Sequence, residues 1–218
     1  RAERVLDLGS GIGSVALAAA WRLPGATLVT LEAQERSVRL ARKTVAYNGL
    51  ENRYRILQGD LRDASLLEKE PGFDLVLGSP PYFPAGTAIP ALHPQAVPAR
   101  MEMRGDVRDY ARAAARSLAP GGFFAFVFPA RDARVEEGCR EAGLTLVRRR
   151  DIVFREDEPP VIAVFAAVLT SDLPKDFDGN PELPVRETPL VIRRKDGRRS
   201  AEYAVTLLTL GFPPGPLL

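Results

Sequence analysis

The chain has 218 residues, of which 45% are hydrophobic and 27% are charged, and this suits one compact domain with a sizeable core. A formal net charge of +2 excludes a strongly basic protein whose charge alone would indicate a polyanionic partner. A single cysteine, Cys139, and a single histidine, His93, exclude a disulfide framework and a Cys- or His-rich zinc site, so we expect no metal.

No apolar run approaches the roughly twenty residues that a membrane-spanning helix needs, and we expect no membrane association. No signal peptide is visible, so a reducing cytoplasm is the expected compartment. The sequence begins at Arg1, directly before a strong strand, and we expect that an upstream piece is missing.

Short apolar runs alternate with helical stretches along the chain. The apolar runs predict strands at 4–8, 27–32, 54–58, 73–77 and 123–128. Helical spacing predicts helices at 14–23, 35–48, 106–118 and 131–142. Two further strands, at 145–154 and 161–169, are joined by E-D-E-P-P and should form an antiparallel hairpin. The alternation before this hairpin predicts an α/β fold, with a parallel sheet and helices on both faces.

Two segments break the alternation. Residues 79–105 are Pro-rich and follow the carboxyl end of the fourth strand, where open α/β sheets bind their ligands. Residues 171–218 begin as a Pro-rich connector and continue with P-L-V-I-R-R, a D-G turn and a helical stretch. We expect residues 1–170 to form the core domain, and 171–218 to form a hairpin and helix packed on that domain.

The stretch V-L-D-L-G-S-G-I-G places three glycines between the first strand and the first helix. Glycines there allow a tight turn and let a ligand approach the backbone and the helix N-terminus. No G-K-[S/T] follows, which excludes a P-loop, and Ser14 replaces the third glycine of the dinucleotide fingerprint. A plain tight turn is the alternative.

Acidic side chains stand at the next two strand ends. Glu32 could accept hydrogen bonds from both hydroxyls of a ribose, and the alternative is a solvated glutamate. Asp60 could accept from an adenine amino group while the Leu61 backbone N–H donates to the ring, and a helix N-cap is the alternative for Asp60.

D-x-G-x-G-x-G, then Glu32, then Asp60 resembles the S-adenosylmethionine site of the class I methyltransferases, over about residues 4–169. The resemblance implies a Rossmann-like fold with a mostly parallel seven-stranded sheet, a C-terminal antiparallel hairpin and S-adenosylmethionine as cofactor. It also implies the donor contacts. These are Asp7, Gly9, Ser10, Gly11 and Gly13 at the methionine moiety, Glu32 at the ribose, and Asp60 and Leu61 at the adenine.

The turn S-P-P-Y follows the fourth strand and fits the pattern [N/D/S]-P-P-[Y/F/W] of methyltransferases that modify planar nitrogens. An aromatic exocyclic amine is a poor nucleophile, and two acceptors on its hydrogens can direct its lone pair toward a methyl group. The Ser79 side chain and the Pro80 carbonyl could be those acceptors. Pro81 stiffens the turn, and Tyr82 and Phe83 could contact the planar target. The alternative is a rigid turn that only ends a strand.

A narrower similarity is to the bacterial tRNA (valine) adenine-N6 methyltransferases. It rests on S-P-P-Y-F, the Pro-rich loop, A-R-M-E-M-R-G-D at 99–106 and the terminal D-G-R-R-S-A-E-Y. That family usually has asparagine where this chain has Ser79, and S-P-P-[Y/F] is also familiar from cytosine-N4 DNA methyltransferases. The family also carries a segment before the first strand that helps cover the donor.

Arginines are the candidate RNA contacts. Arg100 and Arg104 lie in the loop after the S-P-P-Y turn, and Arg193 and Arg194 begin the basic run R-R-K-D-G-R-R. A solvated hairpin is the alternative for that run. The sequence therefore predicts an N-methyltransferase of adenine in tRNA or other structured RNA. The alternatives are methylation of cytosine N4 in DNA or of a protein glutamine, and a donor- or RNA-binding module that has lost transfer.

Overall fold

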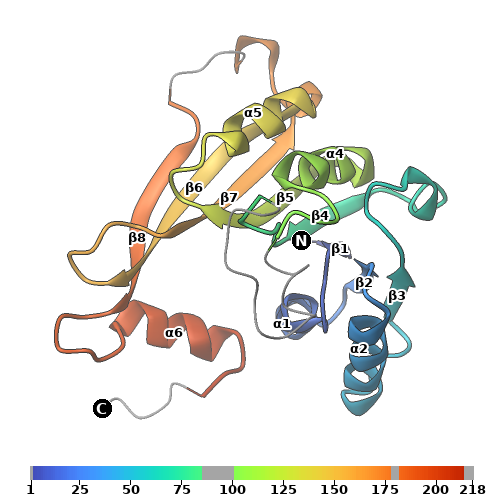
Figure 1. Ribbon diagram of the computed structural model, residues 1–218, viewed down its shortest axis with the longest axis horizontal. Helices are drawn as coiled ribbons and strands as arrows, with labels where there is room; N and C mark the ends of the chain where they lie inside the picture. The colour runs from blue at the N-terminus through green and yellow to red at the C-terminus, as the bar shows by residue number, and fades with distance from the viewer. Residues whose placement is uncertain (1, 85–100, 178–181, 214–218) are drawn as a thin grey trace.

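The computed structural model describes residues 2–84, 101–177 and 182–213. In this part of the chain, one sheet has the strand order β3-β2-β1-β4-β5-β7-β6-β8 (Figure 1). The strands are β1 Arg4–Leu8, β2 Thr27–Glu32, β3 Tyr54–Gln58, β4 Phe73–Gly78, β5 Leu118–Pro129, β6 Leu144–Arg155, β7 Ile162–Leu169 and β8 Val185–Arg193. The α-helices are α1 Ser14–Arg22, α2 Glu35–Tyr47, α4 Val107–Ser117, α5 Arg134–Glu141 and α6 Ala201–Thr209. No described helix is long and apolar enough to cross a membrane.

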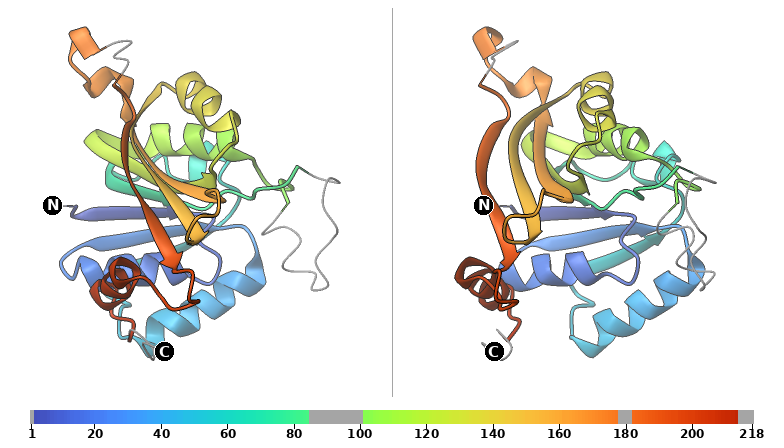
Figure 2. Two further views of the ribbon diagram at one scale, coloured as in Figure 1. Left: turned by 90° about the vertical axis from the view of Figure 1, so that its left-hand side faces the viewer. Right: turned by 60° about the vertical axis from the view of Figure 1, so that its left-hand side comes forward.

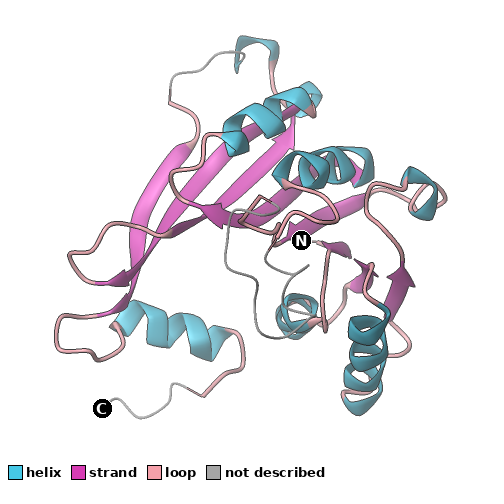
Figure 3. Ribbon diagram, viewed as in Figure 1, coloured by secondary structure: helices cyan, strands magenta, loops and turns pink. Residues whose placement is uncertain are grey.

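Helices cover both faces of the sheet, as predicted (Figures 2 and 3). Because successive strand residues point to opposite faces, the apolar strands supply two cores. On one face, Ala16 and Ala20 of α1 and Val45 of α2 pack with Val5 and Leu28. On the other face, α4 and α5 bury a larger cluster that includes Tyr110, Val135, Phe124 and Phe126.

Strand polarity brings the candidate site together. β1 pairs in parallel with both β2 and β4, and β4 pairs in parallel with β5. The strand order therefore reverses between β1 and β4, which is where open α/β sheets bind ligands. The predicted antiparallel hairpin is confirmed as β6 and β7, with β7 inserted between β5 and β6.

The prediction of seven strands is wrong, because β8 adds an eighth. β8 runs parallel to β6, with Arg148 opposite Val185 and Arg155 opposite Arg193. Its pairing register shifts between Arg150 and Ile152, opposite the part of β8 that contains Pro189. Proline has no N–H to donate to the sheet, which explains the irregularity.

Helix α4 begins at a well-formed cap. The Asp106 side chain accepts from the backbone N–H of Arg108 and Asp109, and the Asp109 carboxylate accepts from the Asp106 N–H. This reciprocal arrangement satisfies N–H groups that the first helical turn leaves unpaired. The helix ends at Ser117, and β5 starts at Leu118, five residues before its predicted start.

Candidate active site

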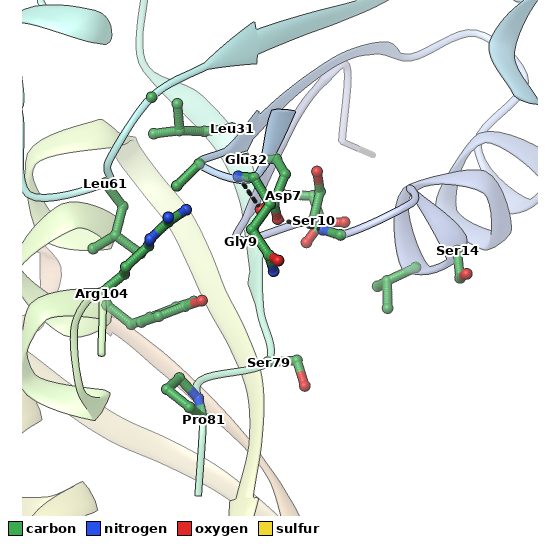
Figure 4. Close-up of a pocket in the computed structure, with 16 residues that line it drawn as sticks. Asp7, Gly9, Ser10, Ser14, Leu31, Glu32, Leu61, Ser79, Pro81 and Arg104 are labelled. Carbon is green, nitrogen blue, oxygen red and sulfur yellow. Dashed lines mark hydrogen bonds between the residues drawn. The ribbon is translucent and has the colours of Figure 1, made fainter. Parts of the chain in front are cut away.

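A pocket of about 240 Å³ lies at the carboxyl ends of β1 and β4 (Figure 4). It is formed by the loop after β1, the start of α1, the segments after β2, β3 and β4, Arg104 and one side chain of α4. The residues that line it are Asp7, Gly9, Ser10, Gly11, Ser14, Val15, Leu31, Glu32, Ala33, Gln34, Gly59, Leu61, Ser79, Pro81, Arg104 and Tyr110.

The glycine loop between β1 and α1 has a backbone that other residues would strain to adopt. Gly9, Gly11 and Gly13 have φ angles of 64°, 57° and 88°, in the left-handed region. The backbone N–H groups of Gly9 and Ser10 both donate to the Leu31 carbonyl, at 2.8 and 3.2 Å. These bonds hold the loop against the end of β2, beside Glu32.

Glu32 links the glycine loop to the start of α2. Its Oε2 accepts from the Gly11 N–H at 2.8 Å, and its Oε1 accepts from the Gln34 N–H at 2.6 Å. Each carboxylate oxygen can accept more than one hydrogen bond, so Glu32 retains acceptor capacity toward the pocket that it lines. These two N–H donors satisfy a side chain that is only 6% exposed.

Asp7 and Ser10 present polar atoms without a protein partner. The Asp7 Oδ2 and the Ser10 Oγ are both buried, and no described residue hydrogen-bonds to either. Burial raises the pKa of Asp7 to about 7; a hydrogen bond from the Ala16 N–H opposes the rise, and the charge of Glu32 adds to it. Unsatisfied buried polar atoms are costly, so these two fit a polar ligand group such as the ammonium of a methionine moiety.

At the end of β3, only one of the two predicted adenine contacts lies in the pocket. Leu61 lines the pocket, and no described residue accepts from its N–H. Asp60 does not line the pocket. Its Oδ1 and Oδ2 accept from the guanidinium of Arg62 at 2.9 and 2.6 Å, and these contacts lower the pKa of Asp60.

The turn after β4 opens onto the same pocket. Ser79 and Pro81 line it, while Pro80 is buried outside its wall. Tyr82 is half-buried, and its ring meets the Phe128 ring edge-on with centroids 5.7 Å apart. Phe83, in contrast, is 45% exposed. Burial raises the pKa of Tyr82, and a hydrogen bond with Ser79 opposes the rise.

Comparisons with known proteins point to one chemistry. The Methyltransferase small domain model matches residues 1–99. The 4-amino-L-phenylalanine/4-methylamino-L-phenylalanine methyltransferase of Streptomyces pristinaespiralis is 39% identical over 127 residues, covering 56% of this chain and 42% of that protein. The release factor glutamine methyltransferase of Gloeobacter violaceus is 36% identical over 130 residues, covering 56% and 44%. The chain thus spans less than half the length of these two relatives.

A third relative matches nearly the whole chain. The tRNA1(Val) (adenine(37)-N6)-methyltransferase of Tolumonas auensis is 28% identical over 209 residues, covering 93% of this chain and 79% of that protein. In fold, the chain is similar to the crystal structure of a predicted O-methyltransferase, protein Atu636 from Agrobacterium tumefaciens. The TM-score is 0.69 at 19% identity, over 96% of this chain and 89% of that one. The chain therefore has the Rossmann-like fold of the class I methyltransferases, and its first 99 residues match the Methyltransferase small domain.

This class of fold implies S-adenosylmethionine as the methyl donor, and the pocket offers groups that suit it. Carboxylates with spare acceptor capacity, unpartnered buried oxygens and a glycine loop without side chains lie together at one end of the sheet. The described residues contain no group of three His, Cys, Asp or Glu side chains that could hold a metal ion.

The predicted substrate arginines are scattered. Arg104 lines the donor pocket, and its charge contributes to the lowered pKa of Asp60. Arg193 donates to the Gly197 carbonyl at 2.9 Å, and Arg194 forms an ion pair with Asp196 at 3.1 Å. Neither lines the pocket. Arg100 lies outside the described residues.

Tyr110 of α4 is a pocket residue that sequence reasoning missed. It is 6% exposed, and a Cβ placed on Gly9 would lie 2.0 Å from its hydroxyl oxygen. Burial and the nearby charges of Glu32, Asp7 and Asp60 raise its pKa, so the phenol stays neutral. The only signal in the sequence is an aromatic residue at helical spacing, which is the usual pattern of a core residue.

Proposed function

We propose that the chain is a class I methyltransferase that transfers a methyl group from S-adenosylmethionine to an exocyclic amine, N6 of adenine in tRNA or other structured RNA. One observation carries the proposal: Ser79 and Pro81 line the same pocket as Asp7, Gly9 and Glu32. The turn suited to holding an amine is therefore adjacent to the loop suited to holding the donor.

The donor supplies a methyl group activated on a sulfonium. In our proposal the Asp7 carboxylate faces the donor's ammonium, next to the loop of Gly9, Ser10, Gly11 and Gly13. Glu32 accepts from the ribose hydroxyls through the acceptor capacity that Gly11 and Gln34 leave free. The Leu61 N–H donates to the adenine ring. Asp60 can reach the adenine amino group only if Arg62 shares or releases it.

Ser79 needs a defined hydroxyl orientation in order to accept from an amine. In our proposal Ser79 donates its hydroxyl hydrogen to the phenolic oxygen of Tyr82, with which it is hydrogen-bonded. Both lone pairs of the Ser79 Oγ can then face the amine, and the Pro80 carbonyl supplies the second acceptor. In this arrangement positioning is the main catalytic contribution, and no general base is required. Tyr82 and Phe83 flank the planar target.

The comparisons support a conjugated nitrogen as acceptor. Adenine N6, a glutamine amide and the ring amine of 4-aminophenylalanine all carry a lone pair delocalised into a planar group. RNA is favoured because the tRNA methyltransferase relative aligns with 93% of this chain. Arg104, and Arg100 outside the described residues, are proposed contacts to that RNA. Arg193 and Arg194 are also proposed contacts, although each would have to exchange its internal partner for a phosphate.

Substrate class is tested by supplying labelled donor with separate pools of tRNA, ribosomal RNA, DNA and protein, followed by mass spectrometry of the modified residue. We expect label on adenine N6 in the tRNA pool. Label in DNA alone would indicate the cytosine-N4 reaction, and label on a protein glutamine would favour the activity named for the release factor relative. Absence of label in every pool would favour a binding module.

Ser79 is tested separately from donor binding. Ser79→Ala should lower the transfer rate at least a hundredfold, because one amine acceptor is lost, while affinity for S-adenosylhomocysteine stays within about twofold. Ser79→Asn keeps an acceptor and is the matched control, which should stay active. Full activity of Ser79→Ala would contradict the two-acceptor account.

A further inference from the structure

The basic runs most evident in the sequence are largely paired in the structure. Within R-R-R at 148–150, the three arginines pair with Glu187, Asp151 and Glu202. In the later run, Arg194 pairs with Asp196 and Lys195 with Asp157. A cation that already has a carboxylate partner gains less from a phosphate, because the first pair must be broken.

Helix α2 carries a different set of cations, Arg36, Arg39, Arg42 and Lys43, all of them exposed. Among residues 2–84, 101–177 and 182–213, no carboxylate forms an ion pair with Arg36, Arg42 or Lys43. Arg39 has only a contact of 3.9 Å with Glu35, in which both side chains are more than 60% exposed. That contact is longer than the ion pairs of the two basic runs, which are all 3.1 Å or shorter, and it is screened by solvent as well, so the α2 cations are available to a partner.

These cations form a stripe along one side of the helix. Ser37, Val38, Ala41 and Val45 are the buried positions of α2, so the helix presents its opposite side to solvent. Arg36, Lys43 and Tyr47 are spaced by seven and four residues, which places them almost in line, with Arg39 beside them. From Arg36 to Lys43 the stripe is about 10 Å long, at 1.5 Å per residue. Tyr47, at its far end, is 91% exposed.

The stripe is unfavourable for the helix itself. Arg36 and Arg39, and Arg39 and Lys43, are like-charge neighbours at spacings that bring side chains together. The cations also lie in the first half or the middle of α2, and none is in its last turn, where the helix dipole would favour positive charge. The fold does not relieve this repulsion between the α2 cations. Such an arrangement is expected where a binding partner supplies negative charge.

The stripe begins next to the active site. Gln34, the residue before α2, lines the donor pocket and donates its N–H to Glu32. From there α2 extends along β3 at the outer edge of the sheet (Figure 1). A strand whose target base enters at the Ser79 turn could therefore continue over this helix.

We propose that the stripe of Arg36, Arg39, Lys43 and Tyr47, with Arg42 at its flank, binds the phosphate backbone of the RNA substrate, and that Tyr47 stacks on an unpaired base. This rests on the RNA substrate of the proposed function. Cations with free phosphate-binding capacity next to an exposed aromatic ring are the combination that single-stranded RNA regions require.

The test compares two triple variants by binding labelled tRNA at several salt concentrations. The first is Arg36→Gln/Arg39→Gln/Lys43→Gln. The second, Arg112→Gln/Arg140→Gln/Lys175→Gln, removes the same charge on the side of α4 and α5. We expect the α2 triple to weaken binding roughly tenfold or more, and to make the slope of log affinity against log salt shallower by about two to three. The control triple should leave that slope unchanged.

Two readouts separate a binding role from damage to the fold. The α2 triple removes like-charge repulsion, so its thermal midpoint should equal or exceed that of the parent, and its affinity for S-adenosylhomocysteine should not change. Tyr47→Ala should weaken tRNA binding roughly fivefold or more without altering the salt slope, because stacking releases no counterions.

Three results would overturn the proposal. The first is an unchanged slope in the α2 triple while the parent binds and methylates tRNA, which leaves the proposed function intact. The second is an equal loss of tRNA affinity in both triple variants. The third is an α2 triple that loses affinity only for a protein substrate and not for tRNA. That result would assign the stripe to binding an acidic protein instead. A parent chain that binds no tRNA would overturn both this proposal and the RNA part of the proposed function.

Discussion

Asp7 shows how burial prepares a single residue for a charged ligand. Its carboxyl group is 3% exposed, and its pKa is raised from 3.8 to about 7. Because the folded pKa exceeds the unfolded one, the folded chain binds the extra proton between these two values. The stabilisation from protonated Asp7 is therefore complete below about pH 4, lost as pH rises to about 7 and constant above that. The upper limit of the loss is about 4 kcal/mol.

A cationic ligand group reverses this preference, and so donor binding should depend on pH. Affinity for S-adenosylhomocysteine should rise from pH 6 to about pH 7 and level off by pH 8, since only the ionised Asp7 attracts the ammonium. Asp7→Asn should bind more weakly and show no such dependence. Calorimetry across this range checks both statements, and an identical pH profile in Asp7→Asn would remove Asp7 from the ammonium site.

At the level of the elements, the β1–α1 loop and helix α4 are in close contact at Gly9. The Tyr110 ring from α4 fills the space in which a Gly9 side chain would lie, and it also approaches Gly78 at the end of β4. Glycine at both strand ends is what allows one aromatic ring to pack between the donor loop and the acceptor turn.

Gly9→Ala should therefore destabilise the chain by about 1–3 kcal/mol, from backbone strain at φ 64° and from collision with the Tyr110 hydroxyl. Gly143→Ala is the matched control: its φ is 75°, but nothing lies within 4 Å of the added Cβ, so it carries the strain alone. Adding Tyr110→Phe to Gly9→Ala should recover part of the extra stability that Gly9→Ala loses relative to Gly143→Ala. Urea unfolding measures these three variants and the parent, and equal losses at Gly9 and Gly143 would contradict the collision.

For the whole molecule, the part of the chain after residue 171 enlarges the sheet. β8 pairs with β6, Leu190 is buried, and the Arg150 guanidinium donates to the carboxylate of Glu202 in α6. These contacts favour our proposal that residues 171–218 pack on the core domain and unfold with it.

Leu190→Ala tests this proposal. If β8 unfolds together with the core, the variant should lose about 2–3 kcal/mol in one cooperative transition with an unchanged denaturant slope. Val185→Ala, at a position 53% exposed in the same strand, should cost under about 0.5 kcal/mol. Unchanged global stability in Leu190→Ala, with faster hydrogen exchange confined to β8 and α6, would show an independently unfolding appendage.

Local sequence patterns were enough to predict the alternating strands and helices, the β6–β7 hairpin and the order of the strand-end motifs. These depend on local properties: hydrophobic period, left-handed glycines at 9, 11 and 13, and prolines after β4. Only the tertiary structure decided that β8 joins β6, that Tyr110 reaches Gly9, and that the cations of 148–150 are paired whereas those of α2 are available. Each of these depends on contacts between residues far apart in the chain, which no local pattern specifies.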